Sequence, residues 1–205
     1  MRSTVRRSGA LLGVTLTLGP TACESEPPLG DSEAEAGDST DASTGSSASG
    51  GDEAPTGEFV DLVDHAEWTT VEAVADPLAE HRPSLIECGI AGWYTEGESL
   101  EVDTNFCNYL ALAQPSLAAI HAGRGVRLGF YYFDLTAREP ASAHLAVLVD
   151  GELLYEQAVD IPGDAMVHSL EFEAPFDAPE GATVVFHLHN HGQNTWVLQS
   201  LAAEQ

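Results

Sequence analysis

The chain has 205 residues, of which 33 are acidic and seven basic, so its formal net charge is −26 at pH 7. Such a charge repels nucleic acids and anionic lipid head groups, and we exclude both as direct partners. The acidic balance is typical of a highly soluble surface. Capture of Ca²⁺ by carboxylates is the alternative, although the chain has no loop of the Asp-x-Asp-x-Asp-Gly type.

The first 22 residues have the pattern of an export signal. Three arginines lie within the first seven residues, and an apolar run follows at residues 10–18. A helix that spans a bilayer needs about 20 apolar residues, so this short run indicates a cleavable signal core and not a membrane anchor.

The end of this segment, Pro20-Thr-Ala-Cys23, resembles the lipobox of bacterial lipoproteins, which ends in a cysteine that becomes diacylated. The resemblance implies that a signal peptide of residues 1–22 is removed and that Cys23 carries acyl chains such as palmitate. Glu24 is similar to the residue that follows the cysteine in lipoproteins sorted to the outer membrane, which implies an anchor at the outer membrane or cell surface. An ordinary secretory peptide cut near Ala22 is the alternative.

The cysteine count supports lipidation of Cys23. The chain has three cysteines, so one disulfide leaves one cysteine unpaired, which is unusual in an exported protein. Assigning Cys23 to the lipid leaves Cys88 and Cys107 as a pair, which we expect to form a disulfide in an oxidising compartment. A redox or metal-binding thiol pair is the alternative, but no Cys-x-x-Cys spacing supports it.

Residues 23–57 form the predicted tether between the lipid and the folded domain. Residues 24–57 contain nine acidic residues, no lysine, arginine or aromatic residue, and Leu29 as the one large aliphatic residue. A segment of this composition cannot bury enough apolar surface to offset its chain entropy, so we expect a disordered acidic linker.

Residues 58–205 are predicted to form one all-β domain, because short apolar or alternating runs are separated by turn residues throughout. The sharpest local signal is Asp150-Gly151, which favours a two-residue type I′ hairpin. Only residues 115–121 have a helical pattern. The many short strands predict an antiparallel β-sandwich, with a jelly roll favoured over a barrel. The expected strands cover residues 68–74, 99–103, 109–113, 126–135, 143–149, 152–159, 166–173, 183–190 and 195–201.

A row of histidines, His187, His189 and His191, is the constellation that can bear metal chemistry. Alternate residues of a strand share a face, so the three rings are expected about 6.6 Å apart while Val184, Phe186 and Leu188 point into the core.

Two neighbouring rings of the row can chelate one ion, and imidazole ligands favour Zn²⁺ or Cu²⁺. A further ligand must come from a neighbouring strand, with His144, His168, Glu171 and Glu173 as candidates. An exposed strand face without any metal is the alternative.

The aromatic residues support a different interpretation, a stacking platform for sugar rings. Trp93 and Tyr94, between glycines in the loop that the disulfide closes, are the expected exposed pair, with Asn194 as a hydrogen-bonding partner. The domain resembles carbohydrate-binding and galactose-binding-like jelly rolls in its size and its all-β pattern, and the resemblance implies a glycan ligand. Residues 130 and 132 share one face of their strand and residues 131 and 133 the other, so one of these pairs must be buried.

The sequence lacks Gly-x-Ser-x-Gly, phosphate-binding glycine loops and His-Glu-x-x-His. We therefore predict a non-enzymatic, surface-tethered lipoprotein whose β-sandwich binds an extracellular ligand, with a glycan as the leading class. The first alternative is a metal-binding or metal-dependent domain centred on the histidine row. The second is a structural protein of the cell envelope.

Overall fold

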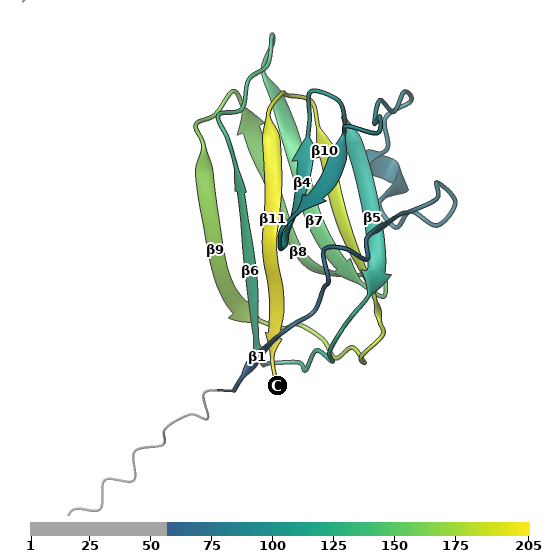
Figure 1. Cartoon of the computed structure of the whole chain (residues 1–205), viewed down its shortest axis with the longest axis vertical. Helices are drawn as coiled ribbons and strands as arrows, with labels where there is room; N and C mark the ends of the chain where they lie inside the picture. The colour runs from purple at the N-terminus through teal and green to yellow at the C-terminus, as the bar shows by residue number, and fades with distance from the viewer. Residues whose placement is uncertain (1–56) are drawn as a thin grey trace, which may run out of the picture. The chain divides into compact units, whose positions relative to one another are not determined.

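The computed structural model describes residues 57–205, and the predicted signal peptide, Cys23 and nearly all of the linker lie outside this range. The described residues form two antiparallel sheets that face each other, as Figure 1 shows. None of the helices in this part of the chain has the length and hydropathy needed to cross a membrane.

The first sheet, called sheet A, contains six strands, in which β1 pairs with β11 beside the path β3-β4-β11-β6-β9. Sheet B has the order β2-β5-β10-β7-β8. The strands of sheet A are β1 (Phe59–Asp61), β3 (Trp93–Glu96), β4 (Ser99–Asp103), β6 (Gly125–Tyr132), β9 (Met166–Glu173) and β11 (Thr195–Glu204). Those of sheet B are β2 (Thr69–Thr70), β5 (Tyr109–Pro115), β7 (Ala141–Val149), β8 (Glu152–Ile161) and β10 (Thr183–Asn190).

The connections between β4 and β11 give the sandwich its jelly-roll topology. The chain enters β4, crosses to β5, returns to β6, and later places β11 between β4 and β6 and β10 between β5 and β7. Two four-stranded sheets of order β4-β11-β6-β9 and β5-β10-β7-β8 are the arrangement of a jelly roll. The predicted fold class, an antiparallel β-sandwich with a jelly roll favoured, is confirmed.

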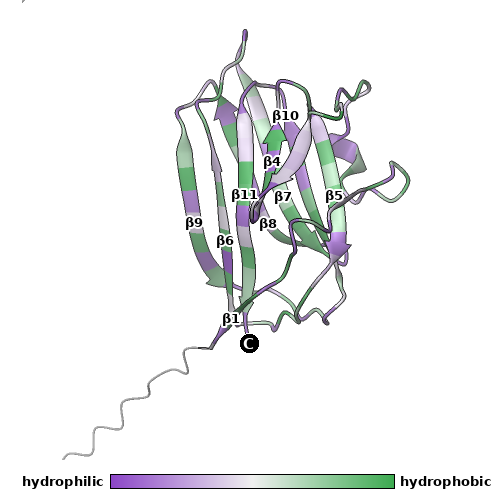
Figure 2. Cartoon of the chain, in the orientation of Figure 1, coloured by the Kyte–Doolittle hydropathy of each residue, from purple (hydrophilic) through white to green (hydrophobic). Residues whose placement is uncertain are grey.

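The core lies between the sheets, because every second residue of the long strands points inward. The largest fully buried side chains include Trp196, Phe130 and Phe186, each about 1% exposed. Figure 2 shows the resulting alternation of apolar and polar residues along β6 and β9. One of the two faces of the strand around residue 131 was expected to be buried, and it is the face that carries Phe130 and Tyr132. Phe133, on the other face, is 48% exposed.

The hairpin between β7 and β8 has the predicted two-residue connection. Asp150 and Gly151 have φ angles of 49° and 83°, and residues with positive φ are what a type I′ turn requires. The strands predicted at residues 99–103, 166–173 and 183–190 have the same bounds in the structure.

Three local predictions are wrong. The strand expected over residues 126–135 ends at Tyr132. Residues 115–121 form no helix, because their backbone groups bond to neighbouring segments: the amide of Leu117 donates to Leu62 and that of Ile120 to Ala178. The strand expected over residues 68–74 is only Thr69–Thr70, because the chain turns away from the sheet after Val71 donates to Ala111.

Residues 71–87 lie against the outer face of sheet B, and we call this segment the cover. It contains a short 3₁₀ helix, η1 (Ala79–His81), and Val71 and Leu78 pack on outward-facing Ala146, Leu148 and Val185. The disulfide joins Cys88, which directly follows the cover, to Cys107, which lies two residues before β5, and it confirms the predicted pairing. The cover therefore shields part of the outer face of sheet B from solvent.

Candidate functional site

The two outer faces of the sandwich differ in chemistry. Sheet B carries histidines that are packed beneath the cover. Sheet A carries exposed aromatic and aliphatic side chains next to carboxylates.

Two members of the predicted histidine row, His187 and His189, lie on the outer face of sheet B, whereas His191 lies beyond the end of β10 and so does not continue the row as a strand residue. Val184, Phe186 and Leu188 belong to the core between the sheets, so His187 and His189 point to the opposite side of β10. That side is not an exposed strand face at His187, which is 0% exposed. His189 and His191 have ring centroids 4.3 Å apart, and His191 is exposed.

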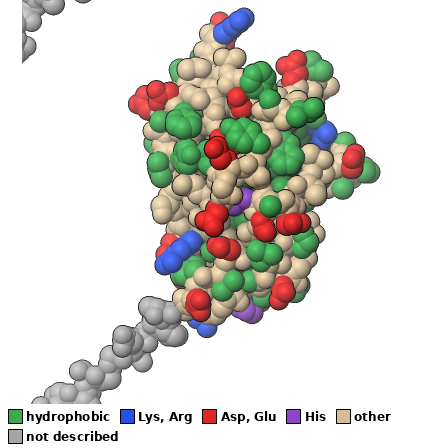
Figure 3. Space-filling view, in the orientation of Figure 1, with side chains coloured by type: hydrophobic (Ala, Val, Ile, Leu, Met, Phe, Trp, Pro, Cys, Tyr) green, Lys and Arg blue, Asp and Glu red, His purple; other side chains and the backbone are tan. Residues whose placement is uncertain are grey.

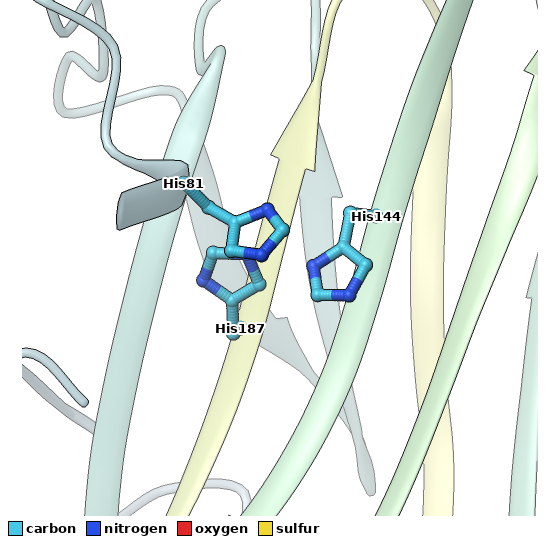
Figure 4. A group of neighbouring side chains, drawn as sticks. All are labelled: His81, His144 and His187. Atoms are coloured by element: carbon cyan, nitrogen blue, oxygen red, sulfur yellow. The ribbon is translucent and has the colours of Figure 1, made fainter. Parts of the chain in front are cut away.

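His187 contacts two histidines that do not belong to the row. His144 lies on β7, with its ring centroid 5.2 Å from that of His187. His81 lies in η1 of the cover, and its ring stacks on that of His144 at 4.2 Å. One nitrogen from each of these three rings lies within 4.8 Å of the other two. Figure 4 shows the three rings gathered between η1, β7 and β10.

Burial lowers the pKa of two histidines on β10. It lowers the pKa of His187 to about 3, and the nearby imidazoles of His144 and His81 add to the shift. Burial likewise lowers the pKa of His189 to about 4. Both rings are therefore neutral at pH 7, which is the form that ligates metals.

A polar network holds η1 above the histidines. Asp76, whose side chain is fully buried, accepts hydrogen bonds from the hydroxyl of Tyr109, from Nη1 of Arg82 at 2.9 Å and from the amide of Leu78 at 3.0 Å. Tyr109 stands on β5, so the network links the cover to the sheet. Burial raises the pKa of Tyr109, and the hydrogen bond to Asp76 raises it further. The hydroxyl therefore stays protonated and acts as a donor.

The outer face of sheet A carries a row of side chains that runs across the strands. Tyr94 on β3 pairs with Glu101 on β4, Glu101 with Val197 on β11, and Val197 with Tyr131 on β6. The row ends at Val167 on β9, which is 73% exposed. We call these five residues the aromatic row.

The aromatic row combines stacking surfaces with a hydrogen-bonding group. The hydroxyl of Tyr94 donates to Oε2 of Glu101 at 2.8 Å, and this bond raises the pKa of Tyr94. Val197 is 2% exposed and forms the floor between Glu101 and Tyr131. Figure 3 shows hydrophobic and acidic side chains interspersed over this face of the molecule.

A shallow hollow continues the row at the β9 end. It has a volume of about 400 Å³ and is lined by Tyr131, Tyr132, Phe133, Ala165, Met166, Val167 and Gln199. The rings of Tyr131 and Phe133 meet edge to face with centroids 5.7 Å apart, and Met166 is 50% exposed. The hollow therefore offers ring faces and an amide at one place.

The predicted pair Trp93 and Tyr94 is divided between the two sides of β3. Tyr94 is 43% exposed on the outer face, whereas Trp93 is half-buried and packs against the core. Neighbouring strand residues point in opposite directions, so the two rings do not share a surface. The side-chain amide of Asn194 is bonded within the turn before β11. It donates to the backbone carbonyl of Asp134 and accepts a hydrogen bond from the backbone N–H of Thr195.

The sequence does not predict how two sets of candidate site residues come together. His81 sits in a segment with no periodic pattern, and no sequence signal places it against β7 and β10. Tyr131 and Phe133 were recognised as a pair that shares a face, and Glu101 and Val167 alternate with core residues; only the strand order shows that these residues meet.

No protein-family model matches the sequence, and no curated protein matches it significantly. Among solved structures the chain is similar to a family 4 carbohydrate-binding module (TM-score 0.38, 13% identity, 72% of this chain and 95% of that one). It is similar to the C-terminal family 6 carbohydrate-binding module of a marine laminarinase from Zobellia galactanivorans (TM-score 0.39, 8% identity, 72% of this chain and 100% of that one). It is also similar to a family 28 carbohydrate-binding module specific for non-crystalline cellulose, with a TM-score of 0.41 and 7% identity over 67% of this chain and 88% of that one. These values are too low to assign the chain to any of these families.

Proposed function

We propose that the protein is a non-enzymatic, surface-tethered lipoprotein whose jelly-roll domain binds carbohydrate on the outer face of sheet A. The observation that carries this proposal is the aromatic row, in which two tyrosine rings, the exposed side chain of Val167 and a carboxylate lie in register across the strands. Sugar rings present apolar C–H faces that pack on aromatic rings and hydroxyls that donate to carboxylates and amides.

The row also indicates the shape of the ligand. Tyr94 and Tyr131 are separated by three strand intervals, which is about 14 Å at the usual spacing between strands. This length suits a ligand of more than one sugar ring that lies across the strands. The hollow lined by Tyr131, Phe133 and Met166 then accommodates one end of it.

The charge of the face narrows the ligand class. Glu96, Glu101 and Asp103 lie on or beside the aromatic row, and the whole chain has a net charge of −26. Uronate or sulfated polysaccharides meet like charge at this face. The favoured ligands are neutral glycans.

A glycan array probed with the purified protein tests the proposal. We expect binding to neutral oligosaccharides, and we expect Tyr131→Ala to weaken it about 5- to 10-fold because stacking on one aromatic ring contributes about 1–1.4 kcal/mol. Isothermal titration calorimetry with the best array ligand measures the change.

Leu153→Ala is the matched control, since Leu153 is 43% exposed on β8 of the other sheet. This variant should bind like the wild type. Absence of binding to every glycan on the array, or equal affinity of Tyr131→Ala and the wild type, contradicts the proposal.

The tether is the second part of the proposed function and rests on the lipobox-like residues 20–23. Lipidation of Cys23 would hold the jelly roll at the cell envelope, with the acidic segment of residues 24–57 as the spacer. Mass spectrometry of the protein from the membrane fraction should find a diacylated Cys23 as the first residue. A Cys23→Ser variant should lose this modification, and an unmodified N-terminus beyond residue 23 in the wild type argues against the anchor.

A further inference from the structure

We propose that His81, His144 and His187 form a binding site for a divalent transition-metal ion, Zn²⁺ or Cu²⁺, between the cover and sheet B. This site is separate from the aromatic row, which lies on the outer face of the other sheet. It also differs from the predicted row of His187, His189 and His191, since only His187 is common to both sets.

The spacing of the rings fits one ion. The three candidate ligand nitrogens lie within 4.8 Å of one another. Zinc–nitrogen bonds are about 2.0–2.1 Å long, so the nitrogens of a tetrahedral site lie about 3.4 Å apart. Shifts of less than about 1 Å, within reach of small ring rotations, bring the three nitrogens into the coordination sphere.

The buried nitrogens of the cluster lack protein partners. His187 is 0% exposed, and among the described residues neither of its ring nitrogens has a hydrogen-bond partner. Nδ1 of His144 is buried and unpartnered as well. Buried polar atoms are paired in most proteins because an unpaired one is costly, so two such rings side by side indicate a ligand that they bind together.

Glu156 supplies an outer-shell partner of the kind that metal-binding histidines have. Its Oε2 lies 3.3 Å from Nε2 of His144, across the strand pair β7 and β8. This contact places the proton of His144 on Nε2 and leaves the lone pair on the unpartnered Nδ1. A carboxylate that fixes the tautomer in this way raises the basicity of the ligating nitrogen.

The donor set selects the metal class. Three imidazoles with no thiolate suit Zn²⁺ and Cu²⁺, whereas Ca²⁺ and Mg²⁺ require oxygen ligands. The nearest buried carboxylate, that of Asp76, already accepts three hydrogen bonds from Tyr109, Arg82 and Leu78. Asp76 is thus a positioning residue, because it fixes the turn that precedes η1 and brings His81 over the sheet.

Titration of the chelator-treated full-length protein with ZnCl₂, and separately with CuSO₄, tests the site by calorimetry and by thermal unfolding. We expect one equivalent of tightly bound metal and a rise in the melting temperature. His81→Ala is the informative variant, since His81 lies in the cover and is only half-buried. It should weaken binding more than about 100-fold, whereas Glu156→Gln should weaken it about 10- to 100-fold as an outer-shell change.

His121→Ala is the matched control, because His121 is an exposed histidine whose nearest charged neighbour is Asp177. It should bind metal like the wild type. Circular dichroism verifies that each variant is folded, and anomalous diffraction at the metal edge locates the ion independently of the variants. The proposal is overturned if neither metal binds, if His81→Ala and the wild type bind equally, or if the anomalous peak lies at His189 and His191.

Discussion

Replacing Trp196 with alanine should lower the free energy of unfolding by about 3–5 kcal/mol. Trp196 is 1% exposed at the centre of sheet A, and its ring lies 4.4 Å from that of Tyr132. Removing it leaves a cavity that the surrounding strands, paired on both sides of β11, are unable to fill by collapse. Urea-induced unfolding at pH 7, followed by circular dichroism, measures the loss.

Val74→Ala serves as the control for this substitution. Val74 is 97% exposed, so its replacement should change the free energy of unfolding by less than about 0.5 kcal/mol. A loss below about 1 kcal/mol for Trp196→Ala would mean that this ring does not stand in the core.

The double variant Cys88→Ala/Cys107→Ala should lose about 3 kcal/mol of stability. The two residues are 19 positions apart, and the disulfide restricts the unfolded chain over this loop, which contains β3 and β4. Cys107 is 2% exposed, so alanine, which adds no buried hydroxyl, is the appropriate replacement. Thermal unfolding of the wild type and the double variant measures the difference.

A reducing agent provides the control, because it acts only through the disulfide. It should lower the melting temperature of the wild type and leave that of the double variant unchanged. A wild type that is insensitive to strong reduction under unfolding conditions, or a double variant as stable as the wild type, contradicts this role of the bond.

The sequence predicts much of this fold because alternation and turn chemistry act locally. The burial of Phe130 and Tyr132 and the positive φ angles of Asp150 and Gly151 both follow from neighbouring residues in the chain. The disulfide was predictable for a different reason: three cysteines and one predicted lipid site leave a single pair.

The candidate sites could be predicted only in part, because they depend on strand order and on a segment without periodic structure. The orientation of His187 follows from its strand, but its burial depends on the cover, whose position is set by the bonds of Asp76 to Tyr109 and Arg82. His144 was a candidate ligand, and only the pairing of β7 with β10 places it near His187. Register of this kind is a tertiary property.

The aromatic row likewise depends on strand order, which the sequence does not predict. Tyr94 was expected on an exposed surface, and its partner in the sequence, Trp93, points toward the core. The residue that shares its surface, Tyr131, is 37 positions later and reaches it only because β4 and β11 lie between β3 and β6.

An NMR titration of the isotopically labelled protein with a neutral oligosaccharide selected on the array tests whether carbohydrate binds on the outer face of sheet A. We expect the amide signals that shift to belong to the aromatic row and the adjoining hollow, with Glu101, Tyr131 and Val167 among the most affected. Shifts confined to sheet B or to the loops at the ends of the sandwich would contradict carbohydrate binding on the outer face of sheet A.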